Sequence, residues 1–167
     1  VEPLVEIYQG DRVSAEHEGA PKAAYAGNPT VQPGGYRPAG FVWNAWAKGY
    51  KLGVQASSDH VSTHISYACT IASGFTRDGL MDAMRKRHSY GATDNIVLDY
   101  RMIAAGNEYL QGDIVKARGP VRLKVKVIGT RPVRQIDIIK NNKYLHTRHP
   151  LESDVSFEFQ DPETTAG

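Results

Sequence analysis

The sequence predicts an α/β unit followed by a mainly β unit. In the first hundred residues, short apolar runs alternate with a helical pattern, as in β-α-β folds. In the remaining residues, strand patterns follow one another with turn signals between them, which indicates an antiparallel, sandwich-like unit. We therefore expect a first domain over residues 1–100 and a second, truncated domain over residues 101–167.

The composition limits the class of protein. The 167 residues are 41% hydrophobic and 23% charged, which is typical of a globular protein, and the formal net charge is +2. This weak positive charge does not favour nucleic acid as a partner. No apolar run approaches the roughly 20 residues of a membrane-spanning helix. A single cysteine, Cys69, excludes an internal disulfide bond.

The first strand pattern, Leu4–Tyr8, carries Glu6 in its middle. A carboxylate in a buried strand costs free energy unless it is paired or bound to a metal ion. Glu6 is therefore either a surface residue of an edge strand or a site residue. Because the pattern begins so close to Val1, we expect the chain to be part of a longer protein, and its cellular location stays open.

A long loop is expected over residues 11–37, where glycine, proline, alanine and asparagine recur. Loops of this length inside a compact domain are usually functional or disordered. The polar and aromatic side chains of the loop either line a substrate pocket or lie on a surface excursion: Arg12, Glu16, Lys22, Tyr25, Tyr36 and Arg37.

A helix is expected over residues 38–48, with Pro38 in its first turn and Gly49 after its end. A strand pattern, Tyr50–Ala56, follows at once. Helix, short turn and strand together make half of a β-α-β unit.

The strand pattern Tyr50–Ala56 runs into Asp59, His60 and His64. In α/β folds the carboxyl ends of the strands carry the chemistry. Aspartate and histidine together suit a divalent ion such as Zn²⁺, Mn²⁺ or Fe²⁺. The residues alone leave two interpretations: a metal site that includes Glu6, or an aspartate that caps a turn beside solvated histidines.

Further along, Thr76 is a candidate N-cap, and the helix after it is expected to end near Arg87 or His88. Its expected buried stripe consists of Leu80, Met81, Ala83 and Met84. Residues 90–95 have the composition of a turn. The strand patterns around and after this helix are Ile65–Ile71, Ile96–Met102, Ile114–Ala117, Val121–Ile128, Val133–Ile139, Tyr144–Leu145 and Val155–Phe159.

Several motifs resemble a known family. They are Val5–Arg12, Gly53–His60 with Ser62–His64, Thr76–Leu80, Arg85–His88 and Tyr90–Asn95. Over nearly its whole length the chain resembles the C-terminal part of a PHP-type (polymerase and histidinol phosphatase) metal-dependent hydrolase. More closely, it is similar to bacterial PHP-like proteins of unassigned function that carry a β-sandwich tail. The resemblance implies a distorted (β/α) barrel that holds divalent metal ions and hydrolyses phosphate esters with a metal-bridging water.

Carried over residue by residue, the resemblance assigns Glu6 and Asp59 to the metal ligands. Position 61 is Val, which departs from the Asp-x-His motif of the family, so either His60 or His64 supplies the imidazole. Asp59 and His60 are the catalytic candidates. Arg12 is the candidate that clamps an anionic substrate, because a guanidinium can bind such a group with two hydrogen bonds.

The His-x-His pair that opens a PHP barrel is absent from this sequence. We therefore expect the isolated chain to be inactive and to need the N-terminal part of the same protein. The alternative is a non-catalytic module with a degenerate metal site that binds a carbohydrate or a protein partner. In that case the alternating row of Arg122, Lys124 and Lys126 would matter more than Asp59.

Overall fold

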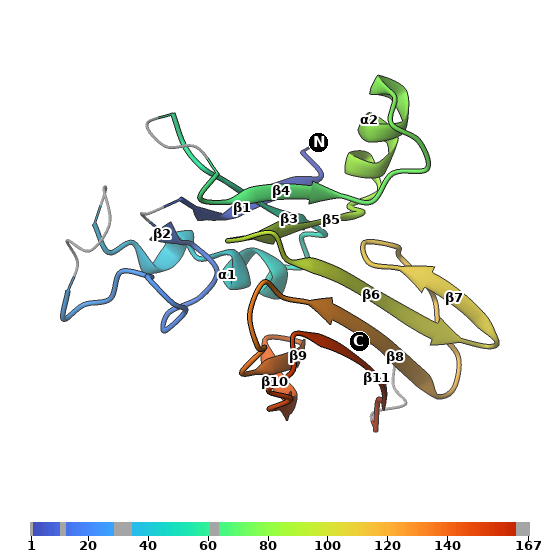
Figure 1. The fold of residues 1–167 in the computed structure, drawn as a ribbon. Helices are drawn as coiled ribbons and strands as arrows, with labels where there is room; N and C mark the ends of the chain where they lie inside the picture. The colour runs from blue at the N-terminus through green and yellow to red at the C-terminus, as the bar shows by residue number, and fades with distance from the viewer. Residues whose placement is uncertain (1, 11–12, 29–34, 61–63, 163–167) are drawn as a thin grey trace. The chain divides into compact units, whose positions relative to one another are not determined.

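The computed structural model describes residues 2–10, 13–28, 35–60 and 64–162 (Figure 1). Strands take up 40% of the chain and helices 12%, so the protein is mainly β with antiparallel sheets. The chain divides into two compact units, Val1–Asp94 and Asn95–Gly167. A boundary after residue 100 would cut through strand β6 (Val97–Ala104). Within the described residues, neither helix has the length and apolar character needed to cross a membrane.

The first unit contains a three-stranded sheet in the order β2-β1-β3 and a two-stranded sheet, β4-β5. Strands β1 and β3 are parallel, and α1 lies between them in the chain, so they form the predicted β-α-β unit. The elements of this unit are β1 (Leu4–Gln9), β2 (Val13–Ser14), a 3-10 turn (Pro38–Gly40), α1 (Val42–Ala47), β3 (Gly53–Ser57), β4 (Tyr67–Thr70), α2 (Arg77–Arg85) and β5 (Ser89–Ala92).

Helix α1 ends as the sequence predicts. Gly49 takes a φ of +86°, in the left-handed region that favours glycine. Its N–H donates to the carbonyl of Trp46 at 2.8 Å, and the N–H of Tyr50 donates to the carbonyl of Ala45 at 3.1 Å. These two hydrogen bonds make a Schellman motif, which satisfies carbonyls at the helix end.

Helix α2 begins as predicted, because the Thr76 hydroxyl accepts a hydrogen bond from the N–H of Gly79 at 3.1 Å. It also ends in a Schellman motif, in which the N–H of His88 donates to the carbonyl of Ala83 at 2.9 Å. Here the left-handed position is taken by Arg87, with a φ of +64°. This residue type carries no signal for a helix end, so the sequence pattern places the end slightly too late.

The expected buried stripe of α2 is wrong for two of its members. Ala83 is buried, but Met81 and Met84 are 39% and 37% exposed, and Phe75 before the helix is 97% exposed. Helix α2 packs on the edge of the unit beside β4 and covers little of it. An apolar stripe in the sequence therefore does not guarantee burial here.

Residues 90–95 are not a simple turn, because Ser89–Ala92 forms β5 and pairs with β4 in an antiparallel manner. Strand β5 lies close to β3: the Ser89 hydroxyl donates to the carbonyl of Val54 at 2.9 Å. A Cβ on Gly91 would lie 2.9 Å from the Cβ of Ala56 and 3.1 Å from the carbonyl carbon of Gln55. The glycine that suggests a turn is needed for the close approach of two strands.

The second unit is a four-stranded antiparallel sheet in the order β11-β8-β6-β7, together with a β9-β10 hairpin. Its elements are β6, β7 (Asn107–Leu110), β8 (Val121–Ile128), β9 (Ile136–Lys140), β10 (Lys143–Arg148) and β11 (Asp154–Gln160). Leu123 and Val125 of β8 and Ile138 of β9 form a common core, so the hairpin packs on one face of the sheet. This agrees with a sandwich-like arrangement of two layers.

One strand predicted for the second unit is absent from the described residues, and one strand of that unit was missed. Ile114–Ala117 is not a strand, although its apolar residues favour one. Strand β7 was not predicted; it follows a tight turn in which Ala105 and Gly106 have φ values of +49° and +79°. The predicted hairpin at Asn141–Asn142 is confirmed, with both φ values positive. An alanine in a left-handed turn gives no sequence signal, whereas paired asparagines do.

We expect Gly91→Ala to lower the free energy of unfolding of the first unit by about 1–3 kcal/mol, because the added Cβ meets backbone and side chain of β3. Gly74→Ala is the matched control, since nothing lies within 4 Å of its added Cβ. Urea titration followed by tryptophan fluorescence measures the change, because both tryptophans, Trp43 and Trp46, lie in this unit. Equal stability of the two variants would contradict the close packing of β5 on β3.

Candidate functional site

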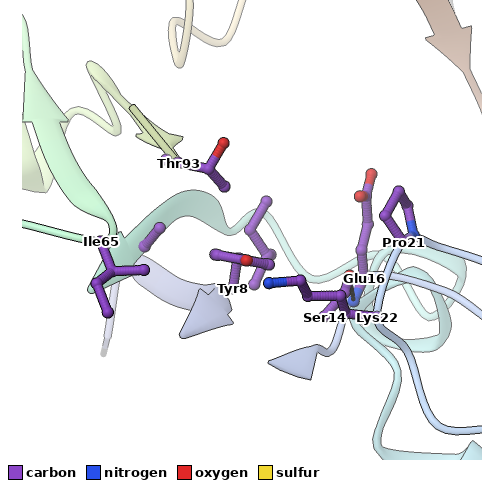
Figure 2. Close-up of a pocket in the computed structure, with 10 residues that line it drawn as sticks. Tyr8, Ser14, Glu16, Pro21, Lys22, Ile65 and Thr93 are labelled. Carbon is purple, nitrogen blue, oxygen red and sulfur yellow. Dashed lines mark hydrogen bonds between the residues drawn. The ribbon is translucent and has the colours of Figure 1, made fainter. Parts of the chain in front are cut away.

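A pocket of about 570 Å³ lies at the carboxyl ends of the parallel strands of the first unit (Figure 2). It is lined by Ile7 and Tyr8 of β1, Ala56 of β3 and Gly91 of β5. Ligands of α/β proteins bind outside the carboxyl ends of parallel strands. The position of the pocket therefore makes it the candidate binding site of this unit.

One wall of the pocket comes from the segment between β1 and α1. Ser14, Glu16, Pro21 and Lys22 line it (Figure 2). Of the charged residues of the long loop, Glu16 and Lys22 thus line a pocket, and its role as a substrate pocket stays a prediction. Tyr25, Tyr36 and Arg37 are not among its lining residues, and Arg12 lies outside the described residues.

The backbone of this segment also caps α1. The N–H groups of Val42 and Trp43, at the start of the helix, donate to the carbonyls of Ala15 and Glu16 at 2.9 and 3.1 Å. The N–H of Ala15 donates in turn to the carbonyl of Ile7 at 2.8 Å. Because Phe41 at the N-cap makes no side-chain cap, these carbonyls satisfy helix donors that would otherwise need water. Glu16 is thereby held between β1 and α1.

Lys22 is oriented toward Tyr8. Its backbone φ is +61°, and its Nζ lies 5.7 Å from the centroid of the Tyr8 ring (Figure 2). An ammonium group at this distance from an aromatic face is attracted to it. Tyr8, Ser14, Ile65 and Thr93 were missed as pocket residues by the sequence analysis. Only Tyr8 offers a signal, since it lies two residues after Glu6 at the end of the same strand.

The structure brings Glu6 together with the end of β3. Parallel pairing places Glu6 opposite Gln55, and the Ser57 hydroxyl donates a hydrogen bond to Oε1 of Glu6. The N–H of Gly10 continues the pairing by donating to the carbonyl of Ser57 at 2.8 Å. Glu6 is half-buried, and the hydroxyl of Ser57 compensates for the loss of water around its carboxylate.

Asp59 and His60 form a second pair. The Oδ1 atom of Asp59 contacts Nδ1 of His60 and also accepts a hydrogen bond from the His60 N–H. The side chain of Asp59 is 7% exposed, whereas that of His60 is 78% exposed. Asp59 has a φ of +72°, so the chain turns sharply where β3 ends.

His64 follows Asp59 and His60 in the chain. It has an exposed side chain and a φ of +62°. The Ser58 hydroxyl stabilises the loop, because it accepts hydrogen bonds from the N–H groups of Ile65 and Ser66, each at 3.1 Å. It also donates to the carbonyl of Ser66 at 2.9 Å. The residues flanking the loop, Ala56 and Ile65, both line the pocket.

Among the residues that the structure describes, no group of three or more His, Cys, Asp or Glu side chains could hold a metal ion. Protein metal sites for Zn²⁺ generally use three or four ligands. The described residues therefore do not complete a metal site by themselves. The assignment of Glu6, Asp59, His60 and His64 as ligands stays a prediction, and so does the catalytic role of Asp59 and His60.

The basic row of the second unit lies on the exposed face of β8, as predicted, but its cations are paired with carboxylates. The pairs are Arg122–Glu158 at 3.0 Å, Lys124–Glu108 at 3.0 Å and Lys126–Asp154 at 3.7 Å. The hydrogen bond and the charge of Lys124 hold the pKa of Glu108 below its ordinary value. This row is therefore largely neutralised by its neighbours on the sheet.

Two uncharacterised chlamydial proteins are similar to this chain. One, from Chlamydia pneumoniae, is 30% identical over 94 residues, which cover 54% of this chain and 15% of that protein. The other, from Chlamydia trachomatis serovar D, is 25% identical over an alignment of 179 residues including gaps, which covers 96% of this chain and 28% of that protein. No family model and no solved structure matches the chain. The chain thus spans less than a third of the length of either relative.

We expect Ser57→Ala to lower the free energy of unfolding by about 1–2 kcal/mol, because it leaves a half-buried carboxylate without its donor. In a Glu6→Ala background the same substitution should cost about 1 kcal/mol less. Urea titration of the four proteins of this double-mutant cycle measures the difference. The control is Lys51→Ala, whose exposed side chain predicts a change within about 0.5 kcal/mol. An equal cost in both backgrounds would rule out the Glu6–Ser57 interaction.

Proposed function

We propose that the chain is part of a metal-dependent hydrolase, a phosphoesterase that uses a metal-activated water, and that it supplies only some of the metal ligands. The observation that carries this proposal is the position of two carboxylates. Glu6 lies on β1 and Asp59 directly after β3, the two parallel strands whose carboxyl ends border the pocket. This is the edge at which α/β enzymes place their chemistry.

The residues of this chain would hold the partial ligand set in place. Ser57 fixes the carboxylate of Glu6, and Ser58 fixes the loop that carries Asp59 and His60. Hydrogen bonds of this kind orient metal ligands in proteins. A bound divalent ion would supply an activated water for hydrolysis. Because the described residues offer no group of three ligands, the other ligands must come from elsewhere in the protein.

The β-α-β unit β1-α1-β3 is, on this proposal, a part of a distorted (β/α) barrel. The two chlamydial relatives extend well beyond the match, which supports a longer protein in which the barrel is completed. We expect the isolated chain to be inactive for the same reason.

The test is the metal content of two purified proteins, this chain and a version extended upstream of Val1, measured by elemental mass spectrometry. We expect near-stoichiometric Zn, Mn or Fe, with hydrolysis of p-nitrophenyl phosphate, in the extended protein only. Asp59→Ala in the extended protein should abolish both. Asp82→Ala is the control, since its carboxylate is 56% exposed on α2 and pairs with Lys86. An extended protein without metal, or an Asp59→Ala variant that retains it, would refute the proposal.

The alternative function is a non-catalytic binding module. The pocket favours it, because a pocket of this size can bind a small molecule without a metal ion. The basic row of Arg122, Lys124 and Lys126 does not favour it, because each cation already has a carboxylate partner. The module would be supported if the protein hydrolyses nothing in the assay above and a separate calorimetric titration finds ligand binding that Asp59→Ala leaves unchanged.

A further inference from the structure

We propose that the pocket of the first unit binds a small zwitterion, with the ligand carboxylate at Lys22 and the ligand ammonium at Glu16. Free amino acids and short peptides with an apolar side chain share this chemistry. The inference goes beyond the proposed function, since it depends on no metal ion and on none of the predicted metal ligands.

The first argument is the charge of the pocket. Lys22 and Glu16, a cationic and an anionic residue, both line it, from one short segment (Figure 2). Within the described part of the chain, neither group forms an ion pair with the other or with a third residue, and the ammonium lies over the Tyr8 ring instead. Two opposite charges that do not neutralise each other are complementary to a ligand that carries both.

The second argument is the set of hydroxyl-bearing residues in the lining. Tyr8, Ser14 and Thr93 line the same pocket as Lys22, and each carries a hydroxyl. Hydroxyl donors beside an ammonium group suit a carboxylate, because hydrogen bonds to a charged acceptor are stronger than those between neutral groups. Glu16 would repel a ligand with several negative charges, and Lys22 would repel one with several positive charges. The pocket is therefore selective for a ligand with one charge of each sign.

The third argument is the apolar remainder of the lining. Ile7, Pro21, Ala56 and Ile65 offer hydrocarbon surface in the same pocket as the charges. Contact with such surface removes apolar groups of a ligand from water, which favours binding. The volume of about 570 Å³ lies within the range of small-molecule sites, so a single apolar residue or a dipeptide has room.

The test is isothermal titration calorimetry of the intact chain with L-leucine and with the dipeptide leucyl-leucine, in buffer containing a chelator. N-acetyl-L-leucine, which lacks the ammonium, and L-leucinamide, which lacks the carboxylate, are the matched probes. We expect at least one zwitterion to bind about tenfold more tightly than its singly charged analogues. Preference between leucine and the dipeptide tells a free amino acid from a peptide as the ligand.

Two variants test which residue binds which charged group of the ligand. Lys22→Met should weaken the zwitterion about tenfold and remove its advantage over leucinamide. Glu16→Gln should remove its advantage over N-acetyl-leucine. Lys51→Met, at an exposed lysine outside the pocket lining, is the control and should bind like the unaltered chain. Circular dichroism checks that each variant is folded.

The proposal is overturned if the folded chain binds neither zwitterion, or if the singly charged analogues bind equally well. It is also overturned if Lys51→Met weakens binding as much as Lys22→Met does. Because the chelator removes divalent ions, binding here is independent of the metal assay. If the chain binds leucine but the extended protein holds no metal, this inference stands while the proposed hydrolase fails.

Discussion

The parallel pairing of β1 with β3 is the constraint on which the first unit depends. Its register sets Glu6 opposite Gln55 and shifts between Glu6 and Tyr8, so that Tyr8 lies opposite Ala56. These last two residues line the pocket, while the hydroxyl of Ser57 reaches the Glu6 carboxylate. The backbone hydrogen bonds between β1 and β3 join two segments that are far apart in the chain. They thereby create both the edge that carries the candidate ligands and the pocket beside it.

The segment between β1 and α1 has two roles that follow from one backbone path. The carbonyls of Ala15 and Glu16 satisfy donors at the start of α1, which is too short to be stable without such help. The same path brings the side chains of Glu16 and Lys22 to the pocket. A change in the backbone of this segment would therefore alter the start of α1 and the lining of the pocket together.

The second unit depends on a different constraint, the pairing and alternation of strands in an antiparallel sheet. Its sheet is antiparallel throughout, with β8 paired between β6 and β11, and β8 alternates between buried Leu123 and Val125 and an exposed basic row. Carboxylates on β11 and β7 compensate that row. Lys140 of β9 forms an ion pair with the buried Asp161 at 2.8 Å. Burial raises the pKa of the Tyr100 hydroxyl in this region, and the charge of Asp161 adds to the effect.

The sequence by itself determined the local features: the strand alternation of β8, the Thr76 cap, the Gly49 stop and the Asn141–Asn142 turn. Each depends on residues that are neighbours in the chain or one turn of helix apart, so the pattern is visible without the fold. Only the tertiary structure decided which charged loop residues reach the pocket, that Gly91 belongs to a strand and that Glu6 meets Ser57. These depend on contacts between distant segments, whose geometry no local pattern encodes.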